Sequence, residues 1–385
     1  MAGTREKLIH AKRIENLIPL MPFYVIEYIE AKKRARYSSS TLLGYLHEYV
    51  KFFSWLISEG ISSAAAIKNI SLEDLQTLSK KNVEFYQEFL ENEIINASEL
   101  ETNPNLEPKT RSESAVNRNI NALKSLFNYL TQETEEDETG ECYFYRNVFN
   151  KIKIHKKEES ASRRAKKINS IILNDEEIDD FLNFIKVDYE KILNQHGKKR
   201  QQAPFLRDKE RDIALISMML GTGVRVSEIA GLTLKEVNFQ QKEIDITRKG
   251  NKADTVDVLT SSLEDLKAYL RIREIKYPGA ASTPYVFVTR YKGTAQPISV
   301  RAIQNLVSKY SEAFFAQDEF STGKVISPHK LRHTFAGDFI KKGGNIILLR
   351  DQLGHNSIET TQKYTNLSKK ERKAVMEAIE SSRNG

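Results

Sequence analysis

The apolar residues of segment 41–60 recur at steps of three and four, the spacing that places side chains on one face of an α-helix. Gly60 follows the last of them and marks the end of the helix. The face consists of Leu42, Leu46, Tyr49, Val50, Phe53, Leu56 and Ile57. The segment therefore predicts a long amphipathic helix that packs in a bundle.

The rest of the first 150 residues has the same character. Pro104 and Pro108 predict a loop at 98–112. Hydrophobic residues make up 40% of the 385-residue chain, which is enough for packed cores. Further helices are predicted at 1–20, 22–34 (with Pro22 at its first position), 80–95 and 112–131. We therefore predict that residues 1–150 form a helical bundle.

Residues 173–385 mix helices with a few strands. Residues 243–248 and 254–259 alternate polar and apolar side chains, and Gly250–Asn251 between them can form a turn, so we predict a β-hairpin. Another strand is expected at 284–290. The predicted helices are 174–195, 206–220, 299–315, 328–342, 345–353 and 368–381. The predicted fold class is mainly α with a small β-sheet, in two domains.

Residues 151–172 carry nearly the whole net positive charge of the chain. Eight cations against two glutamates give a net charge of +6, out of +7 overall. A dense basic segment suits a polyanion such as nucleic acid, although a solvated linker between two domains has the same composition. The cations are Lys151, Lys153, Lys156, Lys157, Arg163, Arg164, Lys166 and Lys167.

Several classes of protein are excluded by what the chain lacks. No apolar run approaches the roughly 18–20 residues that cross a bilayer, and the first residues do not form a secretory signal. Cys142 is the only cysteine, which excludes a disulfide framework and a cysteine-cluster zinc site. No P-loop, GxGxxG, HExxH or GxSxG motif is present, so neither a cofactor nor a metal is expected. These features predict a soluble cytoplasmic protein without membrane insertion.

Two motifs in the second half combine arginine with acidic residues or histidine. Arg225 follows a double-glycine turn at the start of a helix, where it can place two N–H donors on a phosphate or carboxylate, and Glu228 can hold it. His329 and Arg332 share a helix face, where histidine can move a proton and arginine can bind an oxyanion. The plainer interpretations are that Arg225 and Glu228 form an ordinary ion pair at the start of a helix, and that His329 is a buried structural histidine.

Two further motifs supply a lysine, a histidine and a tyrosine. Lys249 lies in the predicted hairpin turn, where it is either solvated or, with the turn in a DNA groove, placed beside a leaving oxygen. His355 lies in a polar turn, and Tyr364 lies on the short helix after it. A phenolate is a nucleophile, but the pKa of free tyrosine is about 10, so we expect neighbouring cations to lower it.

Together these motifs resemble those of the tyrosine recombinase family, which includes the phage integrases and the Xer-type enzymes. TGVRVSE is similar to the first-arginine box, TRKGNK to the hairpin-lysine box, PHKLRHTFA to the His-x-x-Arg box, and LGHNSIETTQKYT to the box with the nucleophilic tyrosine. On this resemblance Glu228 is the acidic support residue, and the six catalytic positions are filled by Arg225, Lys249, His329, Arg332, His355 and Tyr364.

The resemblance implies DNA strand exchange without a metal or cofactor. Tyr364 is expected to attack a phosphodiester and form a 3′-phosphotyrosyl link. Arg225 and Arg332 are expected to bind the non-bridging oxygens, with hydrogen bonds from the two histidines. Lys249 is expected to protonate the departing 5′ oxygen, and His329 to accept the tyrosine proton.

The first half resembles the helical core-binding domain of the same family. MPFYVIEYIEAKK, YSSSTLLGYLHEYVKFFSWL and CYFYRNVFNKI are most similar to the XerS-type subgroup. The implied organisation is a core-binding domain at 1–150, a DNA-contacting linker at 151–172, and a catalytic domain at 173–385. A helix at 368–381 is expected to pack on a neighbouring subunit.

The implied role is Xer-type resolution of chromosome dimers at a dif-like site. The implied partners are double-stranded DNA, further copies of the chain in a homotetramer on two DNA sites, and a septal DNA translocase. An integrase or transposase of a mobile element would use the same chemistry. A monomeric relaxing enzyme of the type IB topoisomerase kind would share it too, and a DNA-binding regulator would have no catalysis. The intact catalytic set disfavours the regulator.

Overall fold

The computed structural model describes residues 2–103, 105–136, 138–153, 172–195, 199–248, 252–317, 325–355 and 357–365. The chain divides into two compact units, Thr4–Lys157 and Glu158–Gly385, the latter together with Met1–Gly3. Each unit has its own apolar core. None of the described helices is both long and apolar enough to span a membrane.

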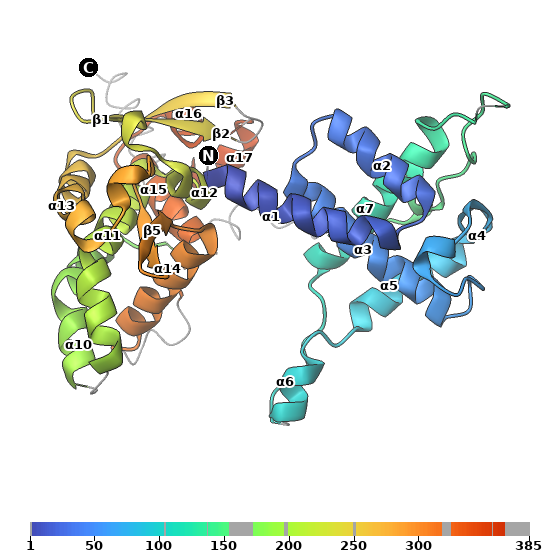
Figure 1. The fold of residues 1–385 in the computed structure, drawn as a ribbon, viewed down its shortest axis with the longest axis horizontal. Coiled ribbons are helices and arrows are strands. Elements are labelled where there is room, and N and C mark those ends of the chain that lie inside the picture. Colours follow the sequence, from blue (N-terminus) through green and yellow to red (C-terminus); the bar gives the residue numbers. More distant parts are fainter. Residues whose placement is uncertain are drawn as a thin grey trace, which may run out of the picture. The chain divides into compact units, whose positions relative to one another are not determined.

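The first unit is built from helices (Figure 1). They are α1 (Ala2–Leu17), α2 (Phe23–Arg34), α3 (Ser39–Ser58), α4 (Leu72–Gln76), α5 (Lys80–Asn92), α6 (Ala97–Thr102) and α7 (Glu113–Gln132), with short 3-10 turns at Ile18–Leu20, Ile67–Asn69 and Val148–Lys151. The Ser38 hydroxyl begins α3 by accepting a hydrogen bond from the Thr41 N–H at 3.1 Å. Leu46, Phe53 and Leu56 of the predicted apolar face are fully buried.

Aromatic rings join the helices of this unit. Phe52 of α3 lies 4.9 Å from Tyr86 of α5 and 5.6 Å from Phe149, measured between ring centroids. Phe127 of α7 lies 4.8 Å from Phe149. Edge-to-face contacts of this kind add to the burial of large apolar side chains.

Two predictions for the first unit need correction. The loop predicted at 98–112 contains α6, because the prolines lie after this helix and do not interrupt it. Pro22 precedes the first residue of α2 and serves as its N-cap.

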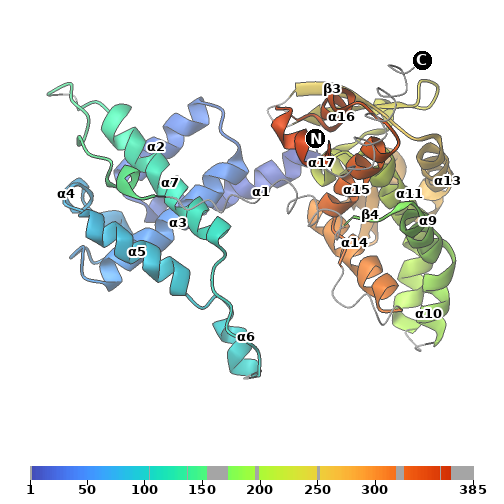
Figure 2. The same cartoon turned by 180° about the vertical axis from the view of Figure 1, so that it is seen from behind.

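The second unit combines helices with two small sheets (Figure 2). Its helices are α9 (Asp175–Asn183), α10 (Tyr189–Gln195), α11 (Lys199–Thr222), α12 (Val226–Gly231), α13 (Thr260–Lys276), α14 (Val300–Phe315), α15 (Pro328–Lys341), α16 (Ile346–Leu353) and α17 (Glu359–Thr365), with a π-helical turn at Phe184–Asp188 and 3-10 turns at Leu234–Glu236 and Ala280–Ser282. Its strands are β1 (Val237–Asn238), β2 (Glu243–Arg248), β3 (Lys252–Asp257), β4 (Val288–Tyr291) and β5 (Thr294–Pro297). The predicted fold class, mainly α with a small sheet, is confirmed.

The predicted hairpin is present. Strands β2 and β3 pair antiparallel from Glu243↔Asp257 to Arg248↔Lys252, and β1 adds a short third strand. The strand expected at 284–290 begins only at Val288 and pairs with β5. Helix α13 was not predicted, because its buried face includes Ser262 and Arg273 and so lacks a clear apolar stripe.

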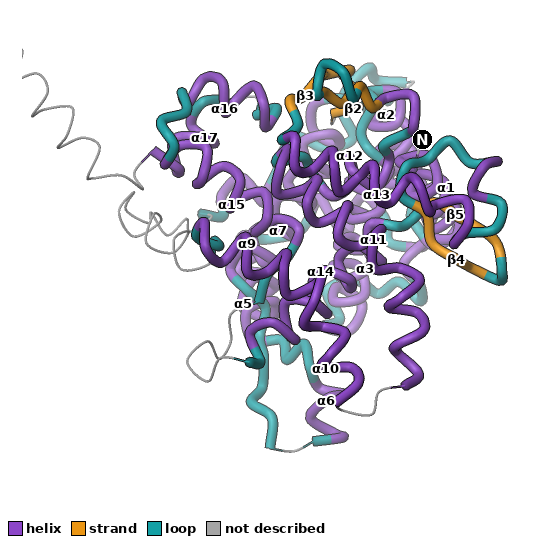
Figure 3. Tube along the Cα trace, turned by 90° about the vertical axis from the view of Figure 1, so that its left-hand side faces the viewer, coloured by secondary structure: helices purple, strands orange, loops and turns teal. Residues whose placement is uncertain are grey.

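Helices α15, α16 and α17 lie next to one another at one end of this unit (Figure 3). They enclose a small apolar cluster of Ile172, Ala336, Ile340, Leu349, Leu353 and Tyr364. Gly354 ends α16 in a left-handed conformation, with φ of 62°. This end of the unit carries most of the predicted catalytic residues.

Candidate active site

Arg225 and Glu228 form a linked pair at the start of α12. The Arg225 backbone N–H donates to Glu228 Oε2 at 2.7 Å, and Arg225 Nη1 donates to Oε1 at 2.9 Å. The preceding Gly223 has a φ of 66°, and a Cβ there would lie 2.4 Å from the Phe335 ring. Glycine therefore allows this turn to approach α15 closely. The Arg225 side chain remains 37% exposed, so a ligand can reach it.

Arg332 lies deeper in the same place. Its Nη1 donates to the Gly223 carbonyl at 2.7 Å and its Nη2 to the Leu353 carbonyl at 2.6 Å. Arg225 Nη2 donates to the next carbonyl, that of Gly354, at 3.4 Å. Both predicted arginines thus meet at the end of α16.

A third arginine, Arg248, was missed by the sequence analysis. It is buried and donates to Glu228 Oε2 at 3.2 Å, to the Leu353 carbonyl at 3.1 Å and to Asp254 Oδ2 at 2.8 Å. The burial along β2 alternates, so Arg248 takes an inward position after two buried isoleucines. That alternation is the signal that could have identified it. A Cβ on Gly354 would lie 2.5 Å from Arg248 Nε, so this approach also requires glycine.

The guanidinium groups of Arg225 and Arg248 both pair with the buried carboxylate of Glu228, and Asp254 at the edge pairs with Arg248. Burial and then the charge of Arg225 lower the pKa of Arg332 to about 10, against the opposing effect of Glu228. Arg332 is still charged near neutral pH. An excess of guanidinium groups over carboxylates suits a bound phosphate, because a guanidinium pairs with two phosphate oxygens at once.

Tyr364 of α17 is 1% exposed and belongs to the apolar cluster. Its hydroxyl forms a hydrogen bond with Nδ1 of His333. Burial raises the pKa of Tyr364 above its ordinary value, and the charge of Arg332 opposes this only in part. Arg332 thus acts on this pKa in the predicted direction, but burial outweighs it and the pKa is raised overall.

The other two predicted histidines lie nearby. His329 is exposed in the first turn of α15, and its ring lies edge-on to that of His333 with centroids 4.4 Å apart. His355 follows Gly354, and its Nδ1 is hydrogen-bonded to the hydroxyl of buried Thr361 at 2.9 Å. This contact ties the turn after α16 to α17.

The remaining predicted positions belong to the first unit or fall outside the described residues. Lys249 falls in the undescribed segment 249–251, between the ends of β2 and β3. Lys151 and Lys153 are exposed in the first unit, whereas the other six linker cations and the helix expected at 368–381 are outside the described part. The structure thus brings together Arg225, Glu228, Arg332, His329, His355 and Tyr364, and adds Arg248 and His333.

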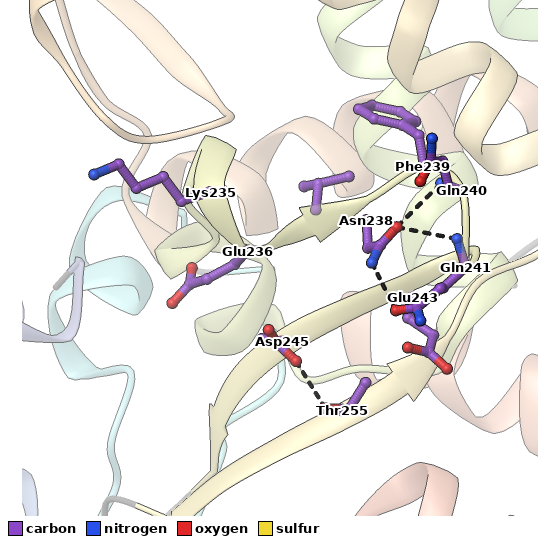
Figure 4. Close-up of a pocket in the computed structure, with 10 residues that line it drawn as sticks. Lys235, Glu236, Asn238, Phe239, Gln240, Gln241, Glu243, Asp245 and Thr255 are labelled. Atoms are coloured by element: carbon purple, nitrogen blue, oxygen red, sulfur yellow. Dashed lines mark hydrogen bonds between the residues drawn. The ribbon is translucent and has the colours of Figure 1, made fainter.

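A separate cavity of about 420 Å³ lies against the three-stranded sheet (Figure 4). Polar side chains line it, and several pair with one another, such as Asp245 with the Thr255 hydroxyl at 2.7 Å. None of the residues of the arginine–tyrosine cluster lines this cavity. Within the described ranges, no group of three His, Cys, Asp or Glu residues is arranged to hold a metal ion.

Comparison with known proteins gives consistent results. Residues 185–371 match the phage integrase family. The tyrosine recombinase XerS of Streptococcus pneumoniae is 37% identical over 369 residues, covering 96% of this chain and 98% of that protein. XerS of Streptococcus gordonii is 36% identical over 376 residues, covering 97% and 99%.

Solved structures show the same fold. The XerH site-specific recombinase bound to a palindromic difH substrate, in a post-cleavage complex, has a TM-score of 0.56 and 21% identity, covering 89% of this chain and 80% of that one. The Tn1549 transposon integrase in complex with transposon right end DNA also has a TM-score of 0.56, with 17% identity, covering 92% and 99%.

Proposed function

This chain belongs to the tyrosine recombinase (phage integrase) family as a Xer-type enzyme that cleaves and rejoins DNA, and from that premise we propose that Tyr364 is its nucleophile. The phenolic oxygen attacks the phosphorus of a DNA phosphodiester and the bond to the 5′ oxygen breaks. The products are a 3′-phosphotyrosyl link and a free 5′-hydroxyl. Because the covalent link conserves the energy of the broken bond, a second 5′-hydroxyl can attack it and rejoin the strand.

The observation that carries this assignment is the cluster of three arginines beside Tyr364, two of which pair with the Glu228 carboxylate. In the transition state the attacked phosphorus carries additional negative charge on its non-bridging oxygens. Arg225 and Arg332 bind these oxygens, because donors already held in position stabilise developing charge effectively. Burial and, after it, the charge of Arg225 lower the pKa of Arg332, and the negative charge of a bound phosphate offsets both effects, which supports this role.

The remaining catalytic groups complete the reaction. His329 and His355 donate hydrogen bonds to the phosphate. Lys249 protonates the departing 5′ oxygen as general acid. Its neighbour Arg248 is anchored to the end of α16, which supports the assignment of Lys249 to this role.

We further propose how the chain binds and exchanges DNA. The eight cations of the 151–172 linker contact phosphates of double-stranded DNA, which fixes position without reading sequence. Strand exchange requires four cleavages, so four copies act together on two sites. The helix at 368–381 packs on a neighbouring subunit. We also propose a septal DNA translocase as a partner and the cytoplasm as the location of the protein.

The biological role that we propose is resolution of chromosome dimers at a dif-like site. The nearly full-length similarity to XerS proteins favours this role over a mobile-element integrase. The fold does not separate the two, since both XerH and the Tn1549 integrase share it. The choice between the two roles therefore rests on which DNA is the substrate.

A plasmid recombination assay separates these roles. Two directly repeated copies of the dif-like palindrome of the source chromosome are placed on one plasmid, and excision of the intervening segment is measured with purified protein. The proposed role predicts excision that requires both copies and is lost in Arg225→Ala. Excision only from the ends of a mobile element would instead establish the integrase role.

A further inference from the structure

Among the described residues, a histidine outside the six family positions contacts the nucleophilic hydroxyl. Nδ1 of His333 and the Tyr364 hydroxyl are hydrogen-bonded, and their ring centroids lie 5.5 Å apart with an interplanar angle of 53°. His333 belongs to α15, one turn after His329, and Tyr364 belongs to α17. The contact therefore fixes the phenol of one helix against the imidazole of another.

Both members of this pair are shielded from water. Tyr364 is 1% exposed and His333 is 8% exposed. A phenol that attacks phosphorus must lose its proton, and a protein group must accept that proton where water is excluded. Imidazole is the side chain best suited to accept a proton near neutral pH.

We propose that His333 accepts the Tyr364 proton during cleavage, an inference that rests on Tyr364 being the nucleophile. The phenolic oxygen forms the bond to phosphorus while its proton moves to Nδ1 of His333, which becomes an imidazolium. The bond from phosphorus to the 5′ oxygen breaks, and Lys249 protonates that oxygen. In rejoining, a 5′-hydroxyl attacks the phosphorus and gives its proton to Lys249, the bond from phosphorus to the tyrosine oxygen breaks, and His333 returns its proton to that oxygen. This assignment replaces the expectation that His329 accepts the proton, and leaves His329 to bind the phosphate.

The charges around the pair couple proton transfer to the substrate. Arg332, the residue before His333, is buried, and its charge acts on Tyr364. This positive charge favours the phenolate but opposes a second positive charge on His333. A DNA phosphodiester bound to Arg225 and Arg332 offsets it. His333 can thus take the proton readily only when DNA occupies the site.

Two substitutions separate proton transfer from positioning. In His333→Asn, the side-chain amide can occupy the place of Nδ1 and keep a hydrogen bond to the hydroxyl, but it takes up no proton. In His333→Ala, the space is open to imidazole from the buffer. Rates of covalent adduct formation are measured in single turnover on nicked duplex DNA. Thermal melting and DNA binding are measured alongside, to verify that each variant is folded.

General base catalysis contributes about 100- to 10,000-fold. We therefore expect His333→Asn to form the adduct at least about 100-fold more slowly than wild type, with DNA binding unchanged. Imidazole should accelerate His333→Ala, more strongly for substituted imidazoles of higher pKa, and leave wild type unaffected. A wild-type rate in His333→Asn overturns the proposal. So does the absence of acceleration in folded, DNA-bound His333→Ala. Failure of wild type itself to form an adduct would instead contradict the assignment of Tyr364.

Discussion

Replacing Glu228 by glutamine is expected to destabilise the catalytic unit strongly. Glu228 accepts a hydrogen bond from the Arg225 backbone N–H and pairs with the Arg225 and Arg248 side chains at 2.9 and 3.2 Å. Its side chain is 3% exposed. Glutamine keeps the shape and one acceptor oxygen but removes the negative charge that pairs with Arg225 and Arg248 and that also acts on Arg332.

Breaking a buried ion pair by removing one partner costs about 3–5 kcal/mol. Because glutamine retains part of the hydrogen bonding, we expect a loss of about 3 kcal/mol, equivalent to a drop in Tm of roughly 6–12 °C for a unit of this size. Glu236→Gln is the matched control. Glu236 accepts the backbone N–H and hydroxyl of Thr233 at 2.7 and 2.8 Å in the same local geometry, without an arginine partner in the described structure. Its loss should cost about 1 kcal/mol.

The single tryptophan makes the assay specific to one unit. Trp55 lies in the unit Thr4–Lys157, whereas Glu228 lies in the other. Melting of full-length variants is followed by far-UV circular dichroism, which reports all helices, and by Trp55 fluorescence. Glu228→Gln should lower the Tm of one transition seen by circular dichroism and leave the Tm of the fluorescence transition unchanged. Equal losses in Glu228→Gln and Glu236→Gln would refute the reasoning, since Glu228 would then be only a helix cap.

Two further predictions concern stability. Gly223→Ala should lower the free energy of unfolding by more than about 2 kcal/mol, because Gly223 has a φ of 66° and a Cβ there meets Phe335. The control Gly293→Ala should lower it by only about 1 kcal/mol, because Gly293 has a φ of 87° but open space around it. Urea unfolding measures both changes. Burial raises the pKa of Tyr28 and of Tyr269 to about 12, above about 10 in an unfolded chain. Above pH 10 the unfolded chain therefore loses these two protons before the folded chain does. The free energy of unfolding should then fall as the pH rises toward 12, by up to about 1.4 kcal/mol per pH unit for each tyrosine. The contribution of Tyr28 or Tyr269 to the absorbance change at 295 nm, taken as the difference between wild type and Tyr28→Phe or Tyr269→Phe, should coincide with unfolding. Ionisation of either tyrosine near pH 10 in the folded protein would contradict this.

The spacing of apolar residues predicted those helices whose buried side chains are apolar. The 41–60 helix was predicted because its buried face is almost entirely apolar. Helix α13 was missed because it buries Ser262, which donates to a carbonyl 45 residues away, and Arg273, which donates to carbonyls 10 to 13 residues further along the chain. Polar burial of this kind depends on tertiary partners that no local pattern contains.

The candidate site likewise contains residues that local motifs predicted and residues that they did not. Arg225, Glu228 and Arg332 were proposed from local motifs, and the structure brings them together. His333 and Arg248 were missed because their roles come from contacts across 31 and 105 residues of sequence, to Tyr364 and Leu353. The direction of the Tyr364 pKa shift was also missed. Motifs revealed nearby cations but not the apolar cluster that surrounds the phenol.

The most direct test of Tyr364 as nucleophile is covalent trapping with that hydroxyl removed. Wild type and Tyr364→Phe are each mixed with nicked duplex DNA carrying the dif-like palindrome, with and without EDTA, and adducts that survive SDS are measured. We predict an adduct with wild type that EDTA does not affect, and none with Tyr364→Phe. An adduct that persists in Tyr364→Phe would place the nucleophile elsewhere and contradict the proposed site.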